Sequence, residues 1–300
     1  MNSQDKPKNF GTVLVLLSAL MFGSYGLWSK LIGPSMGNFY QGWTRSLLIL
    51  VFLVPLGFVR KEIVAIKKED RFWFIVFLVF TSLTQAPIFY AFNHMNIGTA
   101  SLLFFVSMFL TMNIIGVVFF KEQLTKIKFA SIFIALCGMY FVFSFSLTSF
   151  AFFAAAMAIV NGIASGGEVA FSKKLTNNYS SLYIIITSWA IILPTNLIFS
   201  LILKEPQIIP AFSYPWLWQV CYTFVALLAF WLVVVGFKYL DAGIGALLGL
   251  LEIVFSVIFG ILIFKESLTI SVGVGGVLII LAAALPHVQN MFQNKSTSAA

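Results

Sequence analysis

The motif FFKEQLT at residues 119–125 recurs as IFKESLT at residues 263–269, and this repetition is the strongest indication of the fold. The two copies lie 144 residues apart, close to half of the 300-residue chain. A second similarity lies upstream, between GTASLL at 98–103 and GIGALL at 243–248. Self-similarity at a fixed distance indicates that the chain consists of two copies of one structural unit.

The composition places both units in a membrane. Hydrophobic residues make up 60% of the chain, charged residues 9%, and the mean hydropathy is +1.00. A soluble protein needs about 25% charged residues to cover its surface, so most of this chain must face lipid or other apolar helices. The 34 phenylalanines exclude a disordered chain. Cys137 and Cys221 both lie in apolar stretches, which is typical of free buried or lipid-facing thiols.

Ten apolar stretches are long enough to cross a bilayer, which takes about 20 helical residues. They cover residues 11–29, 38–59, 72–93, 98–120, 127–146, 150–172, 181–203, 214–237, 243–264 and 270–288. They are too long and lack the alternation of barrel strands. We therefore predict an all-α integral membrane protein with ten transmembrane helices.

The repeat sets the arrangement of these helices. Five spans separate the two copies of the phrase, so the second unit enters the membrane in the opposite orientation, as in the inverted repeats of secondary transporters. We predict a first five-helix repeat over 11–146 and a second over 150–288. An N-terminal cytoplasmic tail, 1–10, and a disordered C-terminal tail, 289–300, flank them.

The basic residues predict the orientation. With the N-terminus inside, 14 of the 18 basic residues fall in cytoplasmic segments: Lys6, Lys8, Arg60, Lys61, Lys67, Lys68, Arg71, Lys121, Lys126, Lys128, Lys173, Lys174, Lys238 and Lys295. This asymmetry predicts that both termini are cytoplasmic. We expect a multi-pass protein of a bacterial-type inner membrane, whose partner is the lipid bilayer. The net charge of +8 is thus a topology signal and not a nucleic-acid-binding signal.

Three ionisable residues lie within the spans, where charges are costly and mark functional sites. Arg45 is either a ligand for a substrate carboxylate or a structural residue that pairs with a glutamate or with the carbonyls of a broken helix. Glu252 serves proton coupling or, alternatively, a fixed salt bridge with Arg45 or hydrogen bonding to helix ends. Glu168 is a gating residue at the inner mouth or, alternatively, a snorkelling partner of Lys173 and Lys174.

Polar and aromatic residues at depth form a second group of candidates. Gln85 precedes Pro87, which lacks an N–H and predicts a kink with free carbonyls. These polar and aromatic residues have alternative roles in helix packing, in interhelical hydrogen bonds or as anchors at the membrane interface. The expected substrate-binding residues are, with Arg45, Tyr25, Trp28, Gln85, Tyr90, Asn161, Trp189 and Trp231.

The repeated phrase has a local role of its own. We predict structural turn roles for Glu122 and Glu266, whose carboxylates can accept backbone N–H bonds at a helix–helix junction. Glycines also occur at matching places, Gly23 and Gly26 in the first span and Gly166 and Gly167 in the sixth. We expect helices 1 and 6 to bend there during alternating access.

With these features, the chain resembles the drug/metabolite transporter superfamily of the EamA type. Ten spans, two five-helix halves and a Lys-Glu-x-Leu-Thr phrase closing the fourth and ninth spans carry the resemblance, with Trp28-Ser29-Lys30, Arg45 and Gly138. One departure is Glu252-Ile253, where family members often have Glu-Pro. The resemblance implies a central cavity lined by spans 1–4 and 6–9, with spans 5 and 10 as peripheral support.

The sequence thus predicts a secondary transporter that moves a small metabolite, an amino acid or a related amphipathic compound, by alternating access. No phosphate-binding loop, metal-binding or catalytic motif occurs, so we expect neither cofactor nor metal and no enzyme activity. The expected partners are a small-molecule substrate and protons, in a monomer or homodimer. The alternatives are a passive facilitator or channel and a membrane-embedded enzyme.

Overall fold

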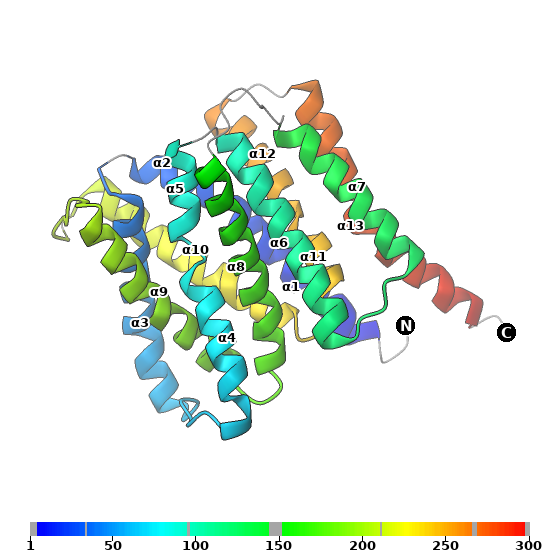
Figure 1. The fold of residues 1–300 in the computed structure, drawn as a ribbon, viewed down its shortest axis with the longest axis horizontal. Helices are drawn as coiled ribbons and strands as arrows, with labels where there is room; N and C mark the ends of the chain where they lie inside the picture. Colours follow the sequence, from blue (N-terminus) through cyan, green and yellow to red (C-terminus); the bar gives the residue numbers. More distant parts are fainter. Residues whose placement is uncertain are drawn as a thin grey trace.

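The structure is a computed structural model and describes residues 5–33, 35–94, 97–143, 152–210, 212–265 and 269–297. These residues form helices and no strand (Figure 1). The helices are α1 (Asp5–Gly23), α2 (Tyr25–Ile32), α3 (Asn38–Val59), η1 (Lys68–Asp70), α4 (Arg71–Ser82), α5 (Ala86–His94), α6 (Ile97–Phe120), α7 (Lys126–Phe143), α8 (Phe152–Leu175), α9 (Ser181–Ile202), α10 (Tyr214–Gly236), α11 (Ala242–Gly249), α12 (Leu251–Phe264) and α13 (Ile270–Thr297).

Each predicted span coincides with a helix or with two consecutive helices. Seven spans are single helices, while α1–α2, α4–α5 and α11–α12 are the divided first, third and ninth spans. In the described part of the chain, eight helical stretches are long and apolar enough to cross a membrane, and Ile270–Pro286 is a shorter apolar stretch. Side chains such as Phe52, Phe72 and Phe133 are exposed on the outside of the bundle, as expected for surfaces that face lipid.

The helix contacts follow the two-fold symmetry of an inverted repeat. In the first half α1 packs on α10 and α12, and in the second half α8 packs on α4, α5 and α6, which are the equivalent helices. The pairs α3–α9 and α7–α13 join equivalent helices directly. The two halves are therefore interleaved, and most of the close packing lies between them.

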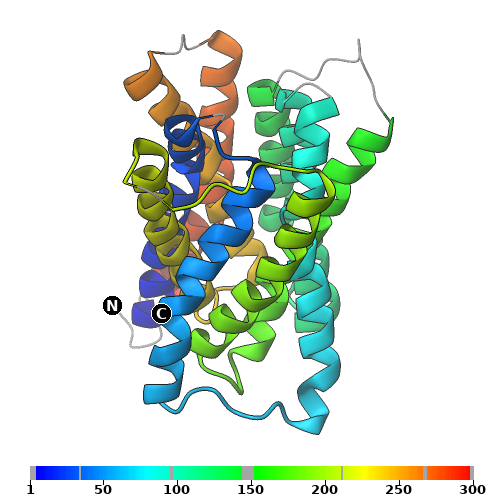
Figure 2. The same cartoon turned by 90° about the vertical axis from the view of Figure 1, so that its left-hand side faces the viewer.

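The chain has two faces along the helix axes (Figure 2). The first, which we call the N-terminal face, carries the start of α1 and the loops 60–70, 121–125, 176–180 and 237–241. The opposite face carries the ends of α2, α5, α9 and α12. The N-terminal face is the one for which the basic residues predict a cytoplasmic location.

Helices α7 and α13 lie together at one edge of the bundle (Figure 1). Their backbones touch at two glycines: a Cβ on Gly138 would lie 2.9 Å from the Gly275 carbonyl oxygen, and one on Gly275 would lie 2.6 Å from the Gly138 carbonyl oxygen. Small residues allow such close approach between helices in lipid. The fifth and tenth spans are thus peripheral, as the resemblance implied.

The helix breaks have local causes. At the first, Ser24 separates α1 from α2, and its hydroxyl donates to the Met21 carbonyl at 2.6 Å. At the second, Pro87 lies in the first turn of α5, where its missing N–H costs nothing. The Leu83 carbonyl at the end of α4 accepts a hydrogen bond from the Asn161 amide at 2.9 Å. The predicted kink beside Gln85 is therefore a complete interruption.

Two predictions concern the continuity of the helices. First, α8 continues without a break through Gly166 and Gly167. A Cβ on Gly166 would lie 2.6 Å from the Met108 carbonyl oxygen on α6, so this glycine permits close packing, and a bend during transport stays a prediction. Second, α13 continues to Thr297, and the disordered tail expected from 289 stays a prediction. Between 287 and 297 no glycine or proline ends the helix.

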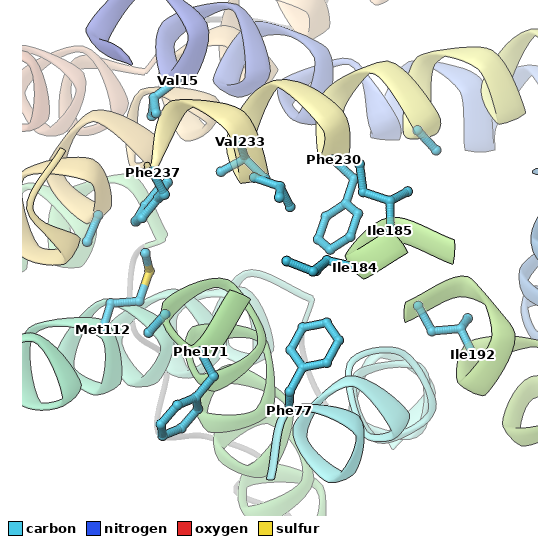
Figure 3. Close-up of a cluster of buried hydrophobic side chains, with 14 of the residues drawn as sticks. Val15, Phe77, Met112, Phe171, Ile184, Ile185, Ile192, Phe230, Val233 and Phe237 are labelled. Carbon is cyan, nitrogen blue, oxygen red and sulfur yellow. The ribbon is translucent and has the colours of Figure 1, made fainter. Parts of the chain in front are cut away.

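Apolar side chains fill the interior between the helices (Figure 3). Phe77 of α4, Ile184 of α9 and Phe230 of α10 point toward one another. Phe171 of α8 and Phe237 of α10 belong to the same buried cluster. Phe77 and Ile184 are completely buried. We call this group the apolar plug; it lies between the two halves on the side of the N-terminal face.

Candidate functional site

Arg45 lies on α3 with its side chain buried, at 5% exposure. Its guanidinium carbon lies 3.9 Å from the centroid of the Tyr222 ring on α10, a cation–π contact. The Arg45 Nε has no hydrogen-bond partner. Within the described part of the chain, no carboxylate lies within 4.0 Å of Arg45. The expected alternative of a fixed salt bridge between Arg45 and Glu252 is therefore absent.

Glu252 lies at the break of the ninth span. The short helix α11 ends at Gly249, Leu250 interrupts the span, and Glu252 is in the first turn of α12. The positive end of a helix dipole favours a carboxylate at this position. The break touches the break of the first span, because a Cβ on Gly23 would lie 2.8 Å from the Glu252 carbonyl oxygen. Two interrupted helices thus meet inside the bundle.

Glu168 is buried on α8, at 8% exposure. Its carboxylate accepts a hydrogen bond of 2.6 Å from the Ser188 hydroxyl on α9. The predicted snorkelling pair with Lys173 and Lys174 does not form. Lys173 lies 3.3 Å from Glu122, and the Lys174 ammonium lies 4.1 Å from the centroid of the Trp73 ring. Seven residues, about 10 Å of helix, separate Glu168 from the end of α8, so it is deeper than expected.

Tyr25 joins these groups into one constellation. Its ring packs edge-on against Tyr222 at a centroid distance of 4.8 Å. It interacts electrostatically with Tyr222, Arg45, Glu252 and Glu168. The five side chains come from α2, α3, α8, α10 and α12, so both halves and two interrupted helices contribute. The result is a region with one guanidinium, two carboxyl groups and two phenols, in which Arg45, Glu168 and Tyr222 are buried and Tyr25 and Glu252 are half-buried.

The constellation contains positions that are equivalent in the two repeats. Helices α3 (Asn38–Val59) and α9 (Ser181–Ile202) each have 22 residues and are 143 positions apart. The same offset relates Arg45 to Ser188 and Tyr25 to Glu168. The first half therefore places a guanidinium and a phenol where the second half places a hydroxyl and a carboxylate.

Three further predicted residues lie near the helix breaks. The Trp28 indole donates to the Ser24 hydroxyl at 3.0 Å. Asn161 binds the free Leu83 carbonyl, and its own Oδ1 lacks a partner. The Gln85 Oε1 also lacks a partner and lies 2.7 Å from the position that a Cβ on Gly42 would take. The two amide oxygens are buried acceptors without a donor, which makes them candidates for ligand contacts.

The other predicted aromatic residues do not join the constellation. Tyr90 is 37% exposed and stacks on His94 at 4.0 Å. Trp189 is buried and packs edge-on against Phe230, with its indole N–H unpaired. Trp231 is partly buried against the apolar core. Packing accounts for the contacts of all three.

Glu122 lies at the junction that the repeated phrase predicted. Its carboxylate accepts hydrogen bonds from the Ala242 N–H at 2.5 Å and the Gly243 N–H at 3.2 Å, at the start of α11. The Lys128 ammonium lies 2.8 Å away. Burial raises the pKa of this carboxyl, but the Lys128 ammonium and the two N–H groups outweigh burial and hold the pKa below its ordinary value. Glu266 lies outside the described residues.

Tyr222 and Ser188 were missed from the sequence. Tyr222 is a tyrosine eight residues inside its span, the same signal that singled out Trp189 and Trp231. Ser188 carries no signal by itself, because serines are common in membrane helices. Applying the repeat offset to Arg45 would have identified Ser188.

The comparisons with known proteins agree with this geometry. The model of the EamA-like transporter family matches residues 9–144 and 152–286, one match for each repeat. The chain therefore belongs to the EamA-like transporter family, whose members are membrane transporters and not enzymes. A solved structure titled only "Crystal structure of protein" shares the fold, with a TM-score of 0.74 and 15% identity over 92% of this chain and 97% of that one. No curated protein matches the sequence.

Proposed function

We propose that this chain is a secondary transporter that moves a small amphipathic metabolite, an amino acid or a related zwitterion, by alternating access. One observation carries the proposal: Arg45 is buried against the Tyr222 ring and, among the described residues, has no carboxylate partner. A buried charge is costly unless it is paired. A substrate carboxylate would complete the bidentate pairing that the Arg45 guanidinium offers.

The remaining groups fit the other end of such a substrate. Glu252 and Glu168 are acidic, and a substrate ammonium group is their complement. The Tyr25 and Tyr222 rings supply apolar walls that stack on carbon atoms or attract the ammonium. A ligand with a single charge would pair with either Arg45 or the two glutamates and leave the other without a partner of opposite charge. The combination therefore favours zwitterions over simple anions or cations.

The direct test begins with binding. Amino acids and related zwitterions are screened by thermal shift on the detergent-purified protein, because a ligand of the native state raises the melting temperature. Ligands that raise it are then followed in proteoliposomes. Accumulation against a gradient supports secondary transport. Flux that stops at equal concentrations would identify a facilitator, and conversion of the ligand would identify an enzyme.

Proton coupling is tested at Glu252. With a pH gradient as the only driving force, the parent protein should accumulate the ligand and Glu252→Gln should not. Equilibrium exchange without a gradient should persist in the variant, which distinguishes lost coupling from lost binding. Accumulation by Glu252→Gln with the pH dependence of the parent would rule out Glu252 as the proton carrier.

A further inference from the structure

The dipeptide Lys-Glu occurs five times, at 61–62, 68–69, 121–122, 204–205 and 265–266. In all of them except 68–69 the lysine has a φ of 54–55°, and in the described part of the chain no other non-glycine residue has a positive φ. These lysines follow the ends of α3, α6, α9 and α12. A left-handed residue turns the chain away from a helix end, so the next residue, a glutamate, is directed toward a neighbouring element.

Two of these glutamates reach across to the other half. Glu122, after α6 of the first half, accepts the Ala242 and Gly243 N–H groups at the start of α11. Glu205, after α9 of the second half, accepts the Phe39 N–H at 3.2 Å and the Tyr40 N–H at 2.7 Å at the start of α3. Each half therefore caps a helix of the other, Glu122 on the N-terminal face and Glu205 on the opposite face.

The two caps hold different kinds of elements. Glu205 joins α3 and α9, which also pack along their lengths: a Cβ on Gly42 would touch Asn196, and one on Gly57 would touch Ile186, at 2.7 and 2.8 Å. This pair stays together without Glu205. Glu122 instead holds α11, a helix of only eight residues that ends at the break before Glu252.

The Glu122 cap is also charged and buried. Lys128 of α7 and Lys173 of α8 lie 2.8 and 3.3 Å from its carboxylate, and the Glu122 side chain is only 5% exposed. Through Lys173 the cap is tied to α8, which carries Glu168 five residues earlier. Glu168 therefore lies on a helix that Glu122 holds, and Glu252 lies just past the break that ends the other one. The apolar plug fills the interior on the same side.

We propose that Glu122, Lys128 and Lys173 form a latch that keeps the N-terminal face closed, and that opening toward this face requires Glu122 to release the start of α11. The Glu205 cap is a permanent joint that does not open. This inference rests on the alternating-access function proposed above. The inference identifies the contact that opens and closes, which is the one between Glu122 and the start of α11. It also links this contact to the positions of Glu252 and Glu168.

The test measures opening without any substrate. A cysteine replaces Ile184, which is completely buried in the apolar plug, in a protein whose own Cys137 and Cys221 are changed to alanine. A water-soluble maleimide then labels this cysteine only when the N-terminal face opens. Glu122→Gln should raise the labelling rate about tenfold, because hydrogen bonds to a charged group are among the stronger ones. The matched control Glu205→Gln should leave the rate unchanged.

A second variant keeps the test decisive if Glu122→Gln does not fold. Lys173→Gln removes one partner of the carboxylate but leaves the α11 cap, so it should raise labelling by about threefold. Unchanged labelling in both variants overturns the latch. An equal increase in the labelling rate of Glu205→Gln would overturn the assignment of the latch to the N-terminal face.

The labelling experiment is independent of transport. Labelling as predicted, in a protein that transports none of the screened ligands, would leave the latch standing and refute the proposed substrate class. Ligand flux with unchanged labelling would refute the latch and leave the transport proposal intact.

Discussion

The two repeats place different chemistry at equivalent positions. In the first half, Arg45 and Tyr25 lie on α3 and α2, and Arg45 is covered by the Tyr222 ring. In the second half, the matching positions are Ser188 and Glu168, which hydrogen bond to each other at 2.6 Å. The first arrangement has a cation without a counter-ion, whereas the second has an acid with its own donor.

The equivalent positions thus differ in chemistry although the scaffold is symmetric. The lengths of α3 and α9, the Gly138–Gly275 contact and the Lys-Glu turns repeat between the halves, because packing constrains them. The charged side chains Arg45 and Glu168 do not repeat, so one half contributes a base and the other an acid. Such an arrangement would orient the proposed zwitterion, whereas two identical groups would offer it no preferred direction. The predictions below change one side at a time.

The largest effect is expected from Arg45→Gln. Loss of the charge should weaken binding of the screened zwitterion by about 100-fold, since removing one partner of a buried charge pair costs several kcal/mol. The melting temperature without ligand should stay the same or rise, because no carboxylate of the protein depends on Arg45. Both quantities come from thermal-shift titrations. A large drop in the stability of the ligand-free variant would instead identify Arg45 as a structural ion-pair partner.

Glu168→Gln should have the next largest effect and tests the acidic side. We expect about a 30-fold loss of zwitterion binding, because the amide keeps the bond to Ser188 but lacks the charge for a substrate ammonium. Binding of a matched analogue without the ammonium should change little, and the comparison of the two ligands is the measurement. Ser188→Ala, which keeps the charge, should cost less than Glu168→Gln. Equal losses for both ligands would contradict an ammonium contact.

Tyr222→Leu removes the ring that covers Arg45. A cation–π contact of a desolvated guanidinium contributes about 2 kcal/mol, or about 30-fold. Part of this contact also exists without ligand, so affinity for the zwitterion should fall about tenfold or less. Tyr222→Phe keeps the ring and should retain most of the affinity. Titrations of the two variants side by side separate the ring from the hydroxyl. Equal losses in Tyr222→Phe and Tyr222→Leu would show that the hydroxyl, and not the ring, is the important group.

The smallest effect concerns the pH dependence at Glu122. Its pKa is lower in the folded protein than its ordinary value of 4.5. Its contribution to stability is therefore complete above about that pH and is lost as the pH falls through the lowered pKa. The difference in melting temperature between the parent and Glu122→Gln should be constant from pH 8 to pH 6 and should shrink below pH 4. A difference that shrinks between pH 8 and pH 6 would contradict a lowered pKa.

Much of the fold was predictable because lipid imposes simple rules. The ten predicted spans match helices in the structure, and α3 has the predicted bounds. The family assignment from the Lys-Glu-x-Leu-Thr phrase is confirmed. The sequence could not predict that the first span breaks at Ser24 whereas α8 is continuous at Gly166. Both places contain glycines, and a glycine can allow either a bend or a close helix contact. The pairs Lys61-Glu62 and Lys204-Glu205 lie 143 residues apart and indicate the same repeat as the pairs at 121–122 and 265–266. This spacing could have been recognised from the sequence.

The site was less predictable than the fold. Arg45, Glu168 and Glu252 stood out because charges in a membrane are rare, but their partners were uncertain. Lys173 was expected to pair with Glu168 five residues away on the same helix, and it pairs instead with Glu122 from a different half. Tyr90 was placed in the site by its distance from Pro87, yet it faces outward and stacks on His94.

Sequence alone predicted ten spans, the inverted repeat and the few charged residues whose place in a membrane needs a reason. Those properties follow from hydropathy, period and the cost of charge in lipid, which act along the chain. Only the tertiary structure decided which charges meet and which do not. Contacts between side chains far apart in sequence depend on the rotation and depth of each helix, which packing against its neighbours determines.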